Sequence, residues 1–126
     1  MPNPTILSAV GDEDRSVREA TWVLTTADPI GTPVQWPEYG DRTWAVAVGT
    51  AGAATLEIQG ANTNVEADFV VLSNAAGGTA LSFTTQPQCE SSIEAPRFAR
   101  PKLTVVGVGA VWTVVLIARR GSGMRT

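Results

Sequence analysis

The chain contains no histidine and only one cysteine, Cys89, among its 126 residues. Without histidine it lacks the usual metal ligand and the only side chain whose unperturbed pKa lies near neutrality, so histidine-dependent triads and metal sites are excluded. A single cysteine can form neither an intrachain disulfide nor a cysteine metal cluster. Cys89 is also a poor nucleophile because Glu90 beside it disfavours the thiolate. No cofactor and no enzymatic activity are expected.

Positive charge is also scarce, with 9 Lys and Arg against 12 Asp and Glu, which gives a net charge of -3. This balance offers no basic footprint for nucleic acid. The charged cluster Asp12 to Asp14 could attract calcium, but no further ligand follows at the spacing of a calcium loop. A solvated charge run is therefore the favoured interpretation of this cluster, and no metal is predicted.

The sequence has no apolar run long enough to cross a membrane. The longest, residues 103–118, falls short of the roughly 18 to 20 residues required and carries Gly107 and Gly109 near its middle. Its content of β-branched residues predicts two buried strands instead. The first 19 residues lack the basic start and apolar stretch of a signal peptide, so no secretion by that route is expected.

Short segments of alternating or β-branched residues recur about every ten residues, with turn signals between them and no helical period. Such a pattern predicts an all-β fold, an antiparallel β-sandwich of jelly-roll-like or Greek-key type. We expect strands at the segments 20–26, 44–48, 54–59, 66–73, 79–85, 102–108 and 111–119, and a short edge strand at 92–95.

The segment 41–60 is central to this prediction. Trp44, Val46 and Val48 alternate with smaller or polar residues, and so do Leu56 and Ile58 with their neighbours. A glycine stands at each end of the turn 49–52, where tight hairpins require positive φ. The pattern predicts a β-hairpin with one apolar face, to be covered by later strands.

The domain boundaries follow from composition. Residues 1–19, rich in proline and charge, are predicted to form an extended N-terminal arm, which either reaches a neighbouring subunit or frays. The sandwich domain spans 20–120, and 121–126 form a flexible C-terminal tail. Within the domain, the segment 27–41 is interrupted by prolines and glycines and is predicted to be a loop.

Candidate partner-binding residues lie in two places. Trp36 and Tyr39 belong to the loop 27–41, where burial against the body is favoured over ligand stacking. Arg97 and Arg100 flank Phe98, and arginine is enriched at protein interfaces because its guanidinium contacts carboxylates in a bidentate manner. The alternative for the arginines, of equal weight, is an intrachain ion pair with Glu90 or Glu94.

The order of motifs resembles that of small β-sandwich structural proteins of tailed bacteriophages. The residues that carry the resemblance are the WPEYGDR loop at 36–42, the hairpin GTAGAATLEIQG at 49–60, the strand GTALSFT at 78–84, the EAPRFARP stretch at 94–101 and a valine-rich final strand that ends in arginines. The loops 61–64 and 107–110 depart from the group. The resemblance implies a virion component of the capsid decoration, or cement, type.

Such a protein is expected to be made in the host cytoplasm and to sit on the outer surface of the capsid. It would bind the major capsid protein, as a homotrimer, without nucleic acid or membrane. Two alternatives remain open: a tail or head-completion component, and a carbohydrate-binding β-sandwich module whose aromatic residues stack on sugar rings.

Overall fold

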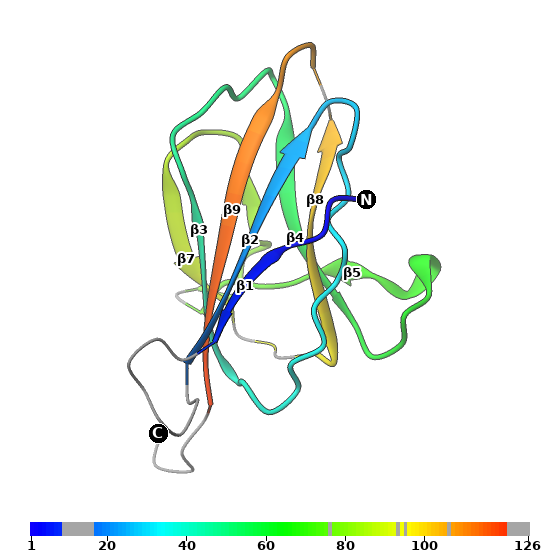
Figure 1. The fold of residues 1–126 in the computed structure, drawn as a ribbon, viewed down its shortest axis with the longest axis vertical. Coiled ribbons are helices and arrows are strands. Elements are labelled where there is room, and N and C mark those ends of the chain that lie inside the picture. The colour runs from blue at the N-terminus through cyan, green and yellow to red at the C-terminus, as the bar shows by residue number, and fades with distance from the viewer. Residues whose placement is uncertain (9–16, 76, 93, 95, 106, 121–126) are drawn as a thin grey trace.

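The computed structural model describes residues 1–8, 17–75, 77–92, 94, 96–105 and 107–120. These residues form two antiparallel sheets that pack face to face, as the sequence predicted (Figure 1). Sheet A has the strand order β1-β2-β9-β3-β7, and sheet B has the order β5-β4-β6 with β8 also paired to β4. The strands are β1 (Thr5–Ser8), β2 (Val17–Thr25), β3 (Asp41–Val46), β4 (Thr55–Ala61), β5 (Val70–Val71), β6 (Ser82–Phe83), β7 (Gln88–Ser91), β8 (Phe98–Val105) and β9 (Val111–Arg119).

Sheet A is organised around β9, which pairs with β2 on one side and β3 on the other. The even-numbered residues of these strands point inward, because side chains alternate between the two faces of a strand. Trp22 lies opposite Val114, and Trp44 lies opposite Leu116. The two indole rings stack on each other across β9 with their centroids 5.9 Å apart. This pair fixes the inner face of sheet A at its centre.

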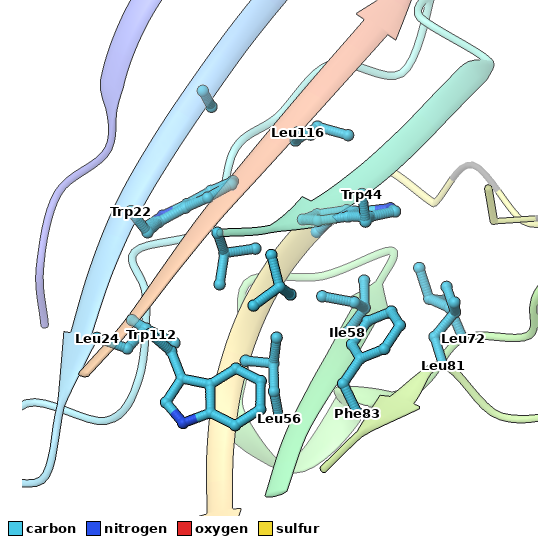
Figure 2. Close-up of a cluster of buried hydrophobic side chains, with 14 of the residues drawn as sticks. Trp22, Leu24, Trp44, Leu56, Ile58, Leu72, Leu81, Phe83, Trp112 and Leu116 are labelled. Atoms are coloured by element: carbon cyan, nitrogen blue, oxygen red, sulfur yellow. The ribbon is translucent and has the colours of Figure 1, made fainter. Parts of the chain in front are cut away.

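Sheet B supplies the other half of the core. Leu56 and Ile58 of β4 are fully buried, and Leu56 lies opposite Leu103 of β8. Leu81 and Phe83 pack on the same cluster (Figure 2). Burying a large apolar side chain contributes about 1.5 to 3 kcal/mol, so this shared core is the main source of stability.

The hairpin predicted for residues 41–60 does not form, because its two strands do not pair with each other. Both strands form and their apolar faces point inward, but β3 belongs to sheet A and β4 to sheet B. The connection between them crosses from one sheet to the other and is held at the end of the sandwich, where the Trp112 indole donates to the carbonyl of Ala51. Gly52 has φ +58° and its backbone packs against Ala110, which leaves no room for a side chain. Val48, beyond the end of β3, is 77% exposed.

Other predicted boundaries also need correction. The N-terminal arm is not free over its described length, because Thr5–Ser8 forms β1, paired with β2, and β2 itself begins at Val17. The predicted strand 66–73 is a 3-10 turn, Glu66–Asp68, followed by the two-residue β5. An edge strand forms at Gln88–Ser91, as β7, while residues 93 and 95 of the expected edge strand 92–95 lie outside the described residues. The acidic cluster 12–14 and the tail 121–126 lie outside the described residues.

The loop 27–41 covers the free edge of β8. Val34 and Ala99 exchange two backbone hydrogen bonds, and the amide of Gly31 donates to the carbonyl of Pro101. The Trp22 indole donates to the carbonyl of Thr32, which ties the loop to sheet A as well. An unpaired strand edge is a site of unwanted pairing with other chains, so this loop protects sheet B.

The apolar run 103–118 supplies the end of β8 and nearly all of β9, so it contributes to two strands, as predicted. Across the described ranges, no helix is long and apolar enough to cross a membrane.

Candidate functional site: the surface around Arg97

Arg97 is the exposed member of the predicted arginine pair, and it stands immediately before β8. Its guanidinium lies over the ring of Phe98, 5.8 Å from the centroid. With the Gln35 amide oriented so that its oxygen faces the guanidinium, that oxygen accepts from Nε and Nη2 at 2.9 and 3.1 Å. The backbone amide of Arg97 donates to Oδ1 of Asn62 at 3.2 Å. Contacts from the loop 27–41 and from the end of β4 therefore hold one outward-facing cation in place.

The predicted ion pair of Arg97 with Glu90 or Glu94 does not form. Glu94 instead accepts a hydrogen bond from the backbone amide of Ser73 at 2.8 Å, and this bond holds the pKa of Glu94 below its ordinary value. Glu90 accepts from the side-chain amide of Asn74 at 2.9 Å. Within the described ranges Arg97 has no carboxylate partner, so its charge is available to one on another molecule.

A groove of about 460 Å³ is lined in part by Pro96, which precedes Arg97, and by Asn62, which accepts from the Arg97 backbone amide. Its lining is apolar along β5 and at Pro96, while Asp68 and Glu94 add carboxylates. The groove is lined by Gly60, Ala61, Asn62, Asp68, Val70, Val71, Leu72, Glu94 and Pro96. Two carboxylates beside an apolar lining can recognise a protein segment that carries positive charge beside a small apolar residue.

Arg100, predicted as a partner contact, is buried and contacts residues of its own chain. It is 2% exposed, and its guanidinium donates to both carboxylate oxygens of Glu66 at 2.8 and 2.7 Å and to Oε1 of Gln59. It also lies 4.0 Å from the centroid of the Phe69 ring. Arg100 does form an intrachain ion pair, but with Glu66, so the predicted partners Glu90 and Glu94 are wrong.

This ion pair sets the protonation behaviour of Glu66. The hydrogen bond from Arg100 is the largest cause, with Lys102 3.6 Å away as a further cation, and together they lower the pKa of Glu66 to about 2. A carboxyl group that acts as a general acid needs a pKa raised toward neutrality. The pKa of Glu66 is lowered instead, which does not suit that role. The arrangement fastens the 3-10 turn Glu66–Asp68 to sheet B.

Trp36 and Tyr39 are buried, with 6% and 2% of their surfaces exposed, as the favoured interpretation required. The backbone carbonyls of both accept hydrogen bonds from Arg42, at 2.7 and 2.8 Å. The guanidinium of Arg18 lies over both rings, and that of Arg120 lies over Tyr39. These contacts anchor the loop to the end of the sandwich, so neither ring is presented for stacking on a ligand.

Sequence reasoning missed Arg42, which is 1% exposed. Burial lowers its pKa to about 10, and its Nη1 atom has no hydrogen-bond partner in the described part of the chain. A signal was available, because Arg42 shares the inward parity of Trp44 and Val46 on β3. The same parity places Arg18 on the inner face of β2, and cation–π contacts then compensate part of its desolvation.

Side chains that could ligate a metal are dispersed. Over the residues that the structure describes, no group of three or more Cys, Asp or Glu side chains gathers at metal-binding distance. Cys89 is a free thiol, exposed on the edge strand β7.

No protein-family profile matches the chain, and no curated protein matches it. Among solved structures, the chain is similar to the crystal structure of the SPBc2 prophage-derived protein YomS, with a TM-score of 0.58 and 12% sequence identity over 94% of each chain. The two proteins therefore share a fold over nearly their whole lengths.

Proposed function

We propose that this chain is a non-enzymatic structural protein of a tailed-phage particle. Specifically, it acts as a capsid decoration protein that binds the major capsid protein on the outer surface of the head, as a homotrimer. The observation that carries the proposal is the shared fold with a prophage-derived protein over 94% of both chains. The order of sequence motifs gives independent support, because it resembles phage β-sandwich structural proteins.

In this role the two-sheet body would act as a rigid block that bridges neighbouring capsid subunits against internal pressure. Side chains that could have served chemistry or ligand stacking are instead used internally, with Glu66 paired to Arg100 and with Trp36 and Tyr39 buried. Arg97, held over Phe98, is the contact that we assign to an acidic group of the capsid. A preorganised guanidinium loses less conformational entropy on binding than a free one.

The proposal is tested by co-sedimentation of the purified protein with expanded phage shells that lack it. We expect the wild-type protein to pellet with the shells, and Arg97→Ala to bind at least about tenfold more weakly, since truncating a charged contact costs about 1.4 kcal/mol or more. Arg119→Ala is the matched control, because it removes the same charge from an exposed arginine at the end of β9. Wild-type protein that stays in the supernatant would contradict the proposal, and binding to isolated tails instead would identify a tail component.

The carbohydrate-binding alternative loses support from the positions of its aromatic residues. It requires exposed rings that can stack on sugars, whereas the five candidates are all buried. These are Trp22, Trp36, Tyr39, Trp44 and Trp112.

A further inference from the structure

The outer face of sheet A is almost free of charge. One row of directly opposed residues crosses all five strands and consists of Thr5, Thr21, Val115, Ala45 and Cys89. Figure 1 shows four of these strands, β1, β2, β9 and β3, side by side. The row contains only short apolar or hydroxyl side chains and therefore forms a level surface.

The neighbouring rows continue this chemistry. Val23, which is 50% exposed, lies opposite Thr113, and Ile117 lies opposite Thr43. Among the described residues of these rows, Glu19 is the only charged side chain. The remaining charges of the face lie at one end, where Arg119 is opposite Asp41.

Such a face is unusual for a small protein that is 17% charged. Contiguous uncharged patches of several hundred Å² mark interaction sites on soluble proteins. At about 3.4 Å per residue and about 4.8 Å between strands, the strands of sheet A fill about 500 Å² of flat area. Side chains project from this plane, so the accessible area of the face is larger than the flat area. It approaches about 600 Å² per partner, which is the lower limit of the area that stable interfaces bury.

We propose that the outer face of sheet A is buried against a second copy of this chain. A level sheet face needs a level partner, and two such faces pack about 10 Å apart with their strands nearly aligned. A second copy offers the same surface, so the valine, threonine and alanine side chains of the two copies contact each other across a two-fold axis. Such a contact joins two chains or, with the homotrimer of the proposed function, two trimers. Each copy has a net charge of -3, and this face is where two copies approach with the least repulsion.

The proposal concerns contacts between copies and does not depend on the capsid partner. Its test is light scattering after size exclusion at two concentrations, on the full chain. We expect the wild-type protein to elute as an assembly with an even number of 13.2 kDa chains, and Val23→Glu to elute at half the wild-type mass. Val65→Glu is the matched control, because Val65 is similarly exposed, at 53%, but precedes the 3-10 turn beside sheet B.

Cys89 provides a second measurement because it is exposed on β7 and belongs to the same face. Its reaction with a maleimide should be slower in the wild-type assembly than in Val23→Glu, which lacks the contact between the two faces. Thr113→Lys replaces Val23→Glu if circular dichroism shows that the latter does not fold.

A wild-type mass of one or three chains at both concentrations overturns the proposal, as does a wild-type mass that persists in the folded face variants. Protection of Cys89 only after phage shells are added would assign the face to the capsid and would also overturn it.

Discussion

The ion pair between Glu66 and Arg100 should make stability depend on pH in a way that one substitution removes. The pKa of Glu66 falls from its ordinary value of 4.5 to about 2 in the folded protein. A depressed folded pKa means that the carboxylate contributes its full stability above pH 4.5 and loses it as the pH falls toward 2. Glu66→Gln keeps the shape of the side chain and removes this titration.

The size of the effect follows from the two environments of the pair. The Arg100 side chain is 3% exposed but that of Glu66 is 62% exposed, so water screens the interaction. Exposed pairs contribute up to about 1 kcal/mol, and loss of a charged hydrogen bond to a buried group costs about 1.5 to 3 kcal/mol. We expect Glu66→Gln to lower the free energy of unfolding by about 1.5 kcal/mol at pH 7, between these ranges.

The measurement is urea unfolding at pH 7 and pH 2.5, followed by the fluorescence of the core tryptophans. The difference between wild type and Glu66→Gln should shrink markedly at pH 2.5, where much of the wild-type contribution is lost. Glu38→Gln is the control, because Glu38 is exposed in the loop 27–41. The reasoning is refuted if Glu66→Gln matches Glu38→Gln at pH 7, or if its deficit is the same at both pH values.

Three further substitutions test the packing. Gly60→Ala should lower the free energy of unfolding, measured in urea, by about 1 to 3 kcal/mol. The reason is that a Cβ at this position would lie 2.3 Å from Cγ of Pro96. Gly40→Ala is the control and should be nearly neutral, because a Cβ there would have no atom within 4 Å. Trp36→Ala should cost about 3 to 5 kcal/mol by the same assay, and a variant of unchanged stability would contradict its anchoring role. Arg42→Met should destabilise the fold by about 2 kcal/mol, since it removes the hydrogen bonds that Arg42 donates to the buried carbonyls of Trp36 and Tyr39. Thermal unfolding would detect the loss, and an unchanged midpoint would argue against those hydrogen bonds.

The sequence predicted which residues face inward better than which strands pair. Alternation placed Trp44 and Leu56 on apolar faces correctly, because side-chain direction is a local property of a strand. Pairing depends on distant segments, and Trp44 finds its neighbour at Leu116. The glycines at 49 and 52 are compatible with a hairpin and with a crossing between sheets, so turn chemistry alone could not decide.

In the candidate site, too, the sequence predicted local features but not the contacts between distant segments. An arginine pair beside a phenylalanine was visible in the sequence, but not which arginine would be exposed. Arg100 is buried because strand alternation turns it toward Gln59 of β4 and because the 3-10 turn brings Glu66 across 34 residues of chain. Arg97 has no such partner nearby in the described structure and remains on the surface.

The position of β9 has a consequence for biosynthesis. The two strands that flank it, β2 and β3, are translated long before it. They do not pair with each other, so only β9 connects them within sheet A. Until β9 leaves the ribosome, Trp22 and Trp44 have no strand between them on which to assemble. Completion of sheet A must therefore wait for nearly the whole described chain, and its non-local contacts favour folding rates in the range of about milliseconds to seconds. A nascent chain stalled before residue 111 would expose the apolar side chains of an incomplete sheet and would be a natural substrate for chaperones.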